Sequence, residues 1–257
     1  MPEVSLILPC YNHAALLERA VASCHAQRGL MEILIVDDHS VDRSLEIAHK
    51  LAAVDDRVRV LQTDRNLGPG GARNAGVRAA RGSHVSFLDT DDELIGTFFG
   101  DALDLMVEHP PMLAVKGEME FFDPIKGYVL PEFDPRYGGV ALSSSCGMVI
   151  DRGTFLRLGG FPEDPIFRGP LGGEDVAFME AVIKYAQPIG RIERPCYRVW
   201  SQAGSHVDKF LANTRLKGAN FEFIHLHPDQ TPEGRLAQAL KAYHVAVATR
   251  VAAPVVL

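Results

Sequence analysis

The sequence has 257 residues, enough for one large domain or for a domain with a small appendage, and its 47% hydrophobic and 23% charged residues are typical of a soluble globular protein. Its formal net charge of −7 argues against nucleic acid as a partner, because phosphate backbones are bound by clustered Lys and Arg. The cysteines fit neither a zinc motif nor a disulfide framework, and we interpret them as buried or incidental thiols in a reducing compartment: Cys10, Cys24, Cys146 and Cys196.

The first residues already form a strand pattern, without the basic start and the small-residue cleavage site of a signal peptide. No apolar run approaches the roughly 20 residues of a membrane span. We therefore expect a cytoplasmic protein, with a peripheral contact to the inner face of the membrane as an open alternative.

Short apolar runs alternate with helical patterns in the first half of the chain. Strands are predicted at 4–8, 32–36, 58–61 and 85–88, and helices at 17–24, 45–51 and 72–80, the last one after a glycine-rich turn at 68–71. Strands that alternate with helices indicate βαβ units, and we predict an α/β protein with a Rossmann-like, mainly parallel central sheet flanked by helices.

From about residue 112 the pattern becomes less regular. Shorter strand-like pieces at 113–116 and 146–150 precede helical patterns at 154–158 and 175–185, and two further helices are expected after residue 210. We expect this C-terminal helical tail to pack on the domain. A homodimer contact or a contact with a membrane interface are the alternatives.

Three aspartates follow the fourth predicted strand, namely Asp89, Asp91 and Asp92. Ligands of open α/β sheets bind beyond the carboxyl ends of the strands. Unit charges about 4 Å apart repel by about 4 kcal/mol near a protein surface, and a divalent cation relieves that repulsion. Carboxylate oxygens suit Mg²⁺ or Mn²⁺. The alternative is an acidic turn that caps the next helix.

Two further segments point to the same crevice. Asp37 and Asp38 end the second strand, where a carboxylate can accept hydrogen bonds from a base or a ribose, or cap the next helix. In the segment 66–74, glycines allow a close backbone approach to a ligand, and Arg73 offers a donor fork suited to phosphate. This segment is not a dinucleotide fingerprint, because Arg73 stands where the third glycine is needed.

Six segments occur in order over roughly residues 3–200, and together they resemble the family 2 glycosyltransferases: LILPCYNH, ILIVDDHS, NLGPGGARNAG, VSFLDTDDEL, LGGFPED and GGEDVAF. The resemblance implies a GT-A fold and an inverting hexosyltransferase that moves a sugar from a nucleotide diphosphate sugar, UDP-linked, to an acceptor hydroxyl. It also implies a GT-A domain at 1–210, with a nucleotide-binding half (1–111) and an acceptor-side half (112–210), before a helical extension at 211–257. The acceptor is open: a sugar, a lipid-linked sugar or a protein.

The resemblance also assigns roles to single residues. It implies donor contacts for one set of residues: Pro9, Tyr11, Asn12, Asp38, Gly71, Arg73, Asp89 and Thr90. Tyr11 and Asp38 would meet the base, the latter at the uracil edge. Asp91 would bind the metal, Mn²⁺ or Mg²⁺, with Asp89 and Asp92 as near alternatives.

The catalytic base is expected at the start of the helix near residue 175. The resemblance implies Asp175 as the base, and the adjacent Glu174 would raise the pKa of Asp175 by like-charge repulsion. The alternative is a helix N-terminus decorated with acids, which contributes about 0.3–1 kcal/mol.

The chain departs from the family at one point. Members often carry a Tyr-Arg-x-His segment whose His completes the metal shell, and here Trp200 stands in that place. Either His206 substitutes for it, or the metal is held by phosphates, water and Asp91. Because of this departure, a catalytically weak or inactive nucleotide-sugar-binding protein stays an alternative function. A nucleotidyltransferase is a weaker alternative, because it needs a glycine-rich, basic loop where this chain has 9–12.

Overall fold

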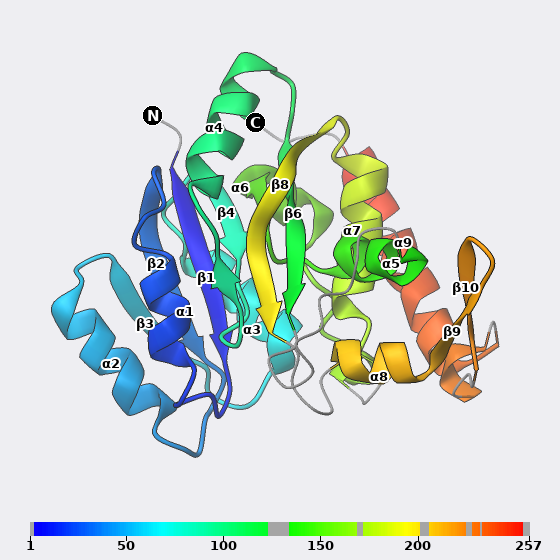
Figure 1. Cartoon of the computed structure of the whole chain (residues 1–257), viewed down its shortest axis with the longest axis horizontal. Coiled ribbons are helices and arrows are strands. Elements are labelled where there is room, and N and C mark those ends of the chain that lie inside the picture. Colours follow the sequence, from blue (N-terminus) through cyan, green and yellow to red (C-terminus); the bar gives the residue numbers. More distant parts are fainter. Residues whose placement is uncertain are drawn as a thin grey trace.

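The computed structural model describes residues 3–122, 134–168, 172–200, 206–224, 228–231 and 233–253, without the side chains of 206–208 and 230. Within these ranges an eight-stranded sheet has the order β3-β2-β1-β4-β7-β6-β8-β5 (Figure 1). Its strands are β1 Val4–Cys10, β2 Leu30–Asp37, β3 Val58–Gln62, β4 His84–Phe87, β5 Glu93–Leu94, β6 Ala114–Phe122, β7 Met148–Asp151 and β8 Ile189–Trp200.

The strands of the first half are parallel, as their alternation with helices predicts. β1 pairs in parallel with both β2 and β4, and β2 pairs in parallel with β3. β7 enters between β4 and β6 and is antiparallel to both, and the two-residue β5 is antiparallel to β8. The predicted mainly parallel α/β sheet is therefore confirmed, with β7 and β5 as its two antiparallel strands.

Helices cover both faces of the sheet (Figure 1). They are α1 Leu17–Ser23, α2 Ser44–Val54, α3 Gly68–Ala79, α4 Phe98–Glu108, α5 Pro135–Ser143, α6 Arg152–Leu158, α7 Glu174–Tyr185, α8 His206–Ala212 and α9 Arg235–Ala252, with 3-10 turns at Pro165–Arg168 and Pro228–Gln230.

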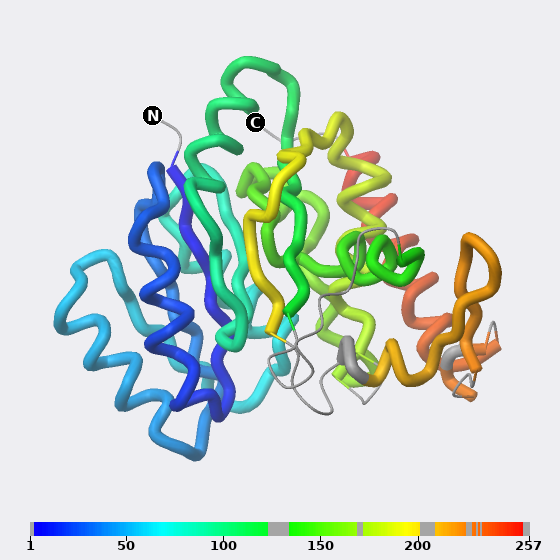
Figure 2. The backbone as a smooth tube through the Cα atoms, viewed as in Figure 1, coloured from blue at the N-terminus to red at the C-terminus, as the bar shows by residue number. Residues whose placement is uncertain are grey.

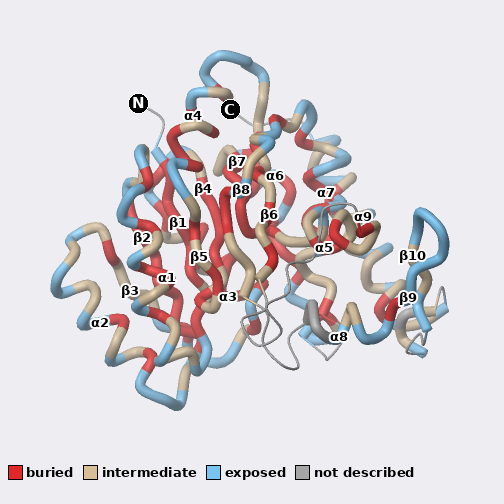
Figure 3. Tube along the Cα trace, viewed as in Figure 1, coloured by how far each residue is buried: buried red, intermediate tan, exposed pale blue. Residues whose placement is uncertain are grey.

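Two apolar clusters form the core, one on each face of the sheet. Leu6 and Leu8 of β1 contribute to the cluster under α1, α2 and α4, and Ile7 contributes to the cluster under α3, α6 and α7. This alternation is the two-residue period of a strand with both faces buried. Buried positions accordingly concentrate on the central strands, while the outer surface of α2 is exposed (Figure 3).

The glycine-rich segment differs from its prediction. It forms the first turn of α3, which begins at Gly68 rather than at residue 72. Gly68 has φ +75°, a left-handed conformation that favours glycine, and Pro69 occupies an early position where no backbone N–H is needed. The glycines thus start the helix instead of forming a separate loop before it.

The C-terminal region also differs from the two expected helices. Between α8 and α9 lies an antiparallel hairpin, β9 Thr214–Lys217 and β10 Asn220–Phe223, with Gly218 at φ +61° in its two-residue turn. The hairpin lies at the end of the molecule opposite to α2 (Figure 2).

α9 packs on the same core as the sheet. Val247 is fully buried in the cluster under α6 and α7, and the Tyr243 hydroxyl donates to the Gly160 carbonyl at 2.7 Å. None of the helices in the described ranges combines the length and the apolar character needed to span a bilayer. The division at residue 210, a homodimer and a membrane contact stay predictions.

Candidate active site

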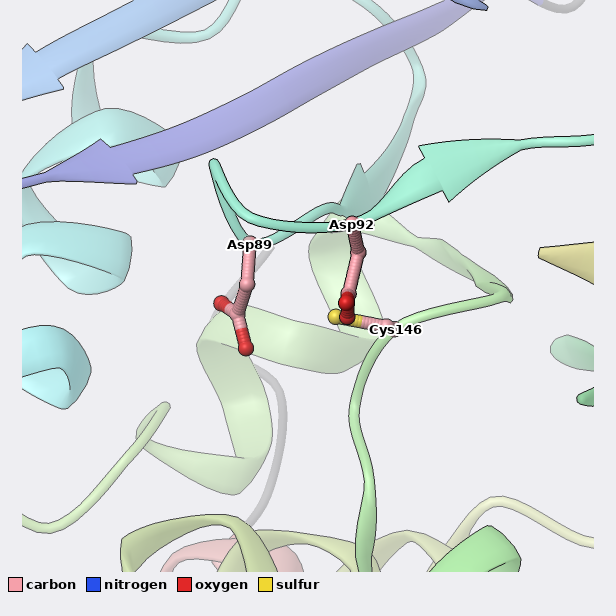
Figure 4. A group of neighbouring side chains, drawn as sticks. All are labelled: Asp89, Asp92 and Cys146. Atoms are coloured by element: carbon pink, nitrogen blue, oxygen red, sulfur yellow. The ribbon is translucent and has the colours of Figure 1, made fainter. Parts of the chain in front are cut away.

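The acidic turn after β4 brings two of its aspartates to the same side. The Asp92 N–H donates to the Asp89 carbonyl at 3.0 Å, which closes a four-residue turn whose ends lie close together. Ligand atoms of Asp89, Asp92 and Cys146 lie within 4.8 Å of one another (Figure 4). Asp91, ranked first as a metal ligand from the sequence, is not in this group, and its metal role stays a prediction.

Cys146 reaches this turn through strand pairing. β7 is antiparallel to β4, with Ser86 opposite Val149. Asp89 lies two residues after β4 and Cys146 two residues before β7, so the pairing of these strands brings both residues to the same edge of the sheet. No sequence spacing signals this approach, because a lone cysteine far along the chain forms no motif. Cys146 is buried, as one of the two expectations for the thiols states.

Arg73 links the acidic turn to the start of α7. Its guanidinium, on α3, is 2% exposed and donates to Asp89 at 2.6 Å and to Asp175 at 3.1 Å, and it lies 3.5 Å from Glu174. Arg73 was expected to meet a phosphate, but in this structure its fork meets carboxylates. The reason is charge: a fully buried guanidinium requires compensating anions, and the acidic residues of two elements supply them.

Asp175 lies in the first turn of α7, and its side chain is 25% exposed. Burial raises its pKa, the Arg73 guanidinium opposes that rise, and the negative charges of Glu174 and Asp89 add to it, so that the pKa of Asp175 is about 7. A carboxyl with a pKa near neutrality is suited to proton transfer as a general base. The Glu174 contribution agrees with the sequence prediction.

Burial and mutual repulsion act on the carboxyls of the acidic turn. Asp92 is 5% exposed, and burial together with its neighbours Asp91 and Asp89 raises its pKa well above the usual range. Burial and the charge of Asp89 also raise the pKa of Asp91. Clustered carboxylates in this state fit a divalent cation, which would replace the protons that they otherwise retain.

The residues expected to lie beneath the nucleotide base are found at the ends of β1 and β2. Tyr11 is 46% exposed and offers a free ring face. Asn12 has φ +57°, and its side-chain oxygen accepts from the Val41 N–H at 2.8 Å, so that it joins the two strand ends. Pro9 lies inside β1, opposite Val36 of β2, and is partly buried.

Asp38 has a different environment from the one expected. It is 2% exposed, and its carboxylate accepts from the backbone N–H groups of Leu67 and Gly68, both at 2.8 Å, and from the Thr63 hydroxyl at 2.9 Å. Asp38 therefore caps the start of α3, whereas the alternative left open from the sequence was a cap of the helix that starts near Asp42. Gly71 keeps this turn tight, because a Cβ there would lie 2.7 Å from the Leu67 Cβ.

A histidine that sequence reasoning gave no role supports the acidic turn. The ring of His13 hydrogen-bonds the Thr90 hydroxyl, and Thr90 is 1% exposed. The His13 backbone N–H donates to the Ser44 hydroxyl at 2.9 Å. His13 thus links the end of β1 to the acidic turn and to α2. In the sequence, its place just after β1 is the one signal of this role.

Trp200 adjoins the acidic turn, in the place where a histidine was expected. Its backbone N–H donates to Asp92 at 3.2 Å, and its ring lies edge-on to Phe122 and 4.5 Å from the Arg19 guanidinium. It therefore contributes a main-chain donor and an aromatic wall. The side chain of His206 lies outside the described residues, and its metal role stays a prediction.

The segment that follows α6 is anchored through Phe161. Phe161 is 2% exposed, stacks within 4.3 Å of Phe178 and 5.2 Å of Phe87, and lies under the Arg73 guanidinium at 5.2 Å. The Phe161 N–H and carbonyl both bond the Asn74 side chain, at 2.9 Å each. This packing holds the Arg73 side chain in position.

The profile of glycosyl transferase family 2 matches residues 5–146. The succinoglycan biosynthesis protein ExoO of Rhizobium meliloti is 43% identical over 109 residues, 42% of this chain and 30% of that protein. An uncharacterized glycosyltransferase of Nostoc sp. is 30% identical over 231 residues, 88% of this chain and 65% of that protein. The chain thus spans less than two thirds of the length of either relative.

Solved structures share the fold. Residues 1–349 of S. aureus TarS in complex with UDP-GlcNAc align with a TM-score of 0.69 and 20% identity, over 96% of this chain and 66% of that chain. The TarS complex with UDP aligns with a TM-score of 0.64 and 22% identity, over 78% and 61% of the two chains. The GT-A fold is thereby confirmed. Because the family profile covers more than half of the residues, the chain belongs to glycosyl transferase family 2, and the family and enzyme class predicted from its six motifs are confirmed.

Proposed function

We propose that this protein is an inverting glycosyltransferase that moves a sugar from a UDP-linked donor to an acceptor hydroxyl. One observation carries the proposal: Arg73 contacts both Asp89 and Asp175, and so holds the acidic turn beside a carboxyl with a pKa of about 7. The complexes of TarS with UDP and UDP-GlcNAc support a uridine donor. A sugar, a lipid-linked sugar and a protein stay equal candidates for the acceptor.

Asp175 acts as the general base in this proposal. The acceptor oxygen forms a bond to the anomeric carbon on the face opposite the diphosphate, and its proton passes to the Asp175 carboxylate. The bond from the anomeric carbon to the diphosphate oxygen breaks, which inverts the configuration. Arg73 keeps the Asp175 carboxylate oriented and limits the rise of its pKa.

The donor is bound by residues at the strand ends. The exposed ring of Tyr11 provides a stacking surface for the base, with Pro9 and Asn12 shaping the turn beneath it. The Asp89 side chain is 36% exposed, and its carboxylate can accept a hydrogen bond from a ribose hydroxyl. Asp38 contributes indirectly, since it holds the start of α3 in place.

The acidic turn provides the candidate cation site. Asp89 and Asp92 are the leading ligands, with Asp91 as their neighbour and His206 as a further candidate. A bound Mn²⁺ or Mg²⁺ would supply positive charge that stabilises the leaving diphosphate. Thr90 and His13 hold the turn in position through their hydrogen bond.

Metal removal is the first test of this function. We expect UDP-sugar hydrolysis, or transfer to a simple acceptor, to be lost with a chelator and restored by Mn²⁺, because the leaving group needs compensating charge. Release of UDP is measured over a panel of donors. Binding of donors by calorimetry without turnover on any of them would indicate an inactive nucleotide-sugar-binding protein, and turnover unchanged by the chelator would contradict the cation site.

The pH dependence of the reaction reports the base. We expect kcat/KM to rise as the pH is raised through about 7, because only the deprotonated Asp175 accepts a proton. Saturating Mn²⁺ should move this limb to lower pH, since neutralising Asp89 removes one cause of the raised pKa. Rates from pH 5.5 to 9 at two Mn²⁺ concentrations measure both effects, and a flat profile would argue against Asp175.

A further inference from the structure

The thiol of Cys146 differs from the thiols of Cys24 and Cys196, which donate hydrogen bonds. Cys24 donates to the Ala20 carbonyl at 3.1 Å, and Cys196 donates to the Arg194 carbonyl at 3.2 Å. Within the described ranges, the sulfur of Cys146 has no hydrogen bond, although the residue is 1% exposed. A buried polar group without a partner calls for an explanation.

The sulfur is directed at the acidic turn. It lies with carboxylate oxygens of Asp89 and Asp92 in one group within 4.8 Å, and Figure 4 shows that the sulfur and the Asp92 carboxylate point toward each other. Asp92 is also buried, and its carboxylate accepts a hydrogen bond from the Trp200 backbone N–H. Two buried groups thus face each other with unused lone pairs.

The backbone around Cys146 is held firmly in this position. The Lys116 ammonium, on β6, donates to the carbonyl of Ser144 at 3.0 Å and to the carbonyl of Cys146 itself. Gly147 has φ +63°, and a Cβ there would lie 2.2 Å from the Tyr197 ring. The segment therefore presents the sulfur at one place rather than sampling several.

We propose that Cys146 is a ligand of the divalent cation bound by Asp89 and Asp92, so that the site favours thiophilic cations. This inference rests on the cation site of the proposed function and adds a ligand that selects the metal. On binding, a sulfur lone pair forms the bond to the metal, and the thiol proton is released to water. Sulfur favours Co²⁺, Zn²⁺ and Cd²⁺, whereas Mg²⁺ is bound by oxygen.

Cadmium provides a readout that does not depend on activity. Demetallated protein without nucleotide is titrated with CdCl₂ while the ultraviolet sulfur-to-cadmium charge-transfer band is followed. We expect a saturating band in the wild type and none in Cys146→Ser. Losing an outer partner of a metal ligand costs about 10- to 100-fold in affinity, so loss of a direct ligand should weaken Cd²⁺ binding at least about tenfold. Mg²⁺ affinity, measured by calorimetry, should change by less than about twofold.

Matched controls separate this role from damage to the fold. Cys24→Ser, also buried, should retain the band. If Cys146→Ser fails to fold, a variant that lacks Cys10, Cys24 and Cys196 still decides the question, because Cys146 is then the remaining thiol and the band must persist. A band that survives in Cys146→Ser, or that is lost in the triple variant, would overturn the proposal.

The result that would contradict the proposed function differs from the one that would contradict the Cys146 ligand. Mn²⁺-dependent turnover of a UDP-sugar without any cadmium band in the wild type would leave the transferase intact and show that the aspartates hold the cation without sulfur. A cadmium band without turnover on any donor would leave the Cys146 ligand intact and contradict the transferase.

Discussion

Asp175→Asn is expected to lower kcat for sugar transfer by about 10²- to 10⁴-fold, the usual contribution of a general base. The amide keeps the shape of the side chain and its contact with Arg73, but it cannot accept the acceptor's proton. The dissociation constant of UDP should stay within about threefold of the wild type, because the base does not touch the nucleotide in the proposed arrangement. Steady-state rates and UDP calorimetry measure the two quantities.

Glu174→Gln is the matched control for this substitution. It removes the neighbouring charge and leaves the base, so the acidic limb of the pH profile should move below about 7 while kcat at high pH changes little. A variant Asp175→Asn with undiminished kcat, or a larger loss of kcat in Glu174→Gln, would assign the base to another residue.

Arg73→Met should damage both stability and catalysis. Removing one partner of a buried ion pair costs about 3–5 kcal/mol, and because the remaining carboxylates are 13–36% exposed, we expect a loss of about 2–3 kcal/mol in the free energy of unfolding. Without the guanidinium the pKa of Asp175 rises further. The folded state then disfavours the ionised carboxyl more strongly, so the loss should be larger at pH 8 than at pH 5.5.

Denaturant unfolding at both pH values tests this expectation, with Arg78→Met as the control. Arg78 lies on the same helix, is 59% exposed and forms only a 3.6 Å contact with Glu163 among the described residues. Its loss should cost less than about 1 kcal/mol. A stability loss for Arg73→Met that is no greater than that for Arg78→Met would show that the buried contacts contribute little.

The acidic turn was predictable in part. Asp89, Asp91 and Asp92 follow an apolar run that ends a strand, and the rule that ligands bind at strand ends locates them without any structure. Which aspartates converge depends on the turn geometry, and the turn brings Asp89 and Asp92 together and leaves Asp91 aside. Sequence spacing does not contain that information, because side-chain direction within a turn follows its backbone angles.

The position of Asp38 illustrates the same limit. Its place at the end of a strand left two roles open, a hydrogen-bond partner for the nucleotide or a cap of the helix that starts near Asp42, and the structure instead places it at the start of α3. The cap depends on where α3 begins, and the glycines at 68–71 that suggested a loop instead form its first turn. The backbone N–H groups that need an acceptor can be identified only when the first residue of the helix is known.

Local sequence determined the order of the elements, the strand-end position of the acids and the family of this protein, because apolar periodicity and contiguous motifs act over a few residues. The tertiary structure alone decided which distant groups meet: Cys146 beside Asp89 and Asp92, and Arg73 between the acidic turn and α7. The raised pKa of Asp175 likewise arises from packing. Burial and neighbouring charges from elements far apart in the chain produce it, and both come into being only when the sheet and its helices assemble.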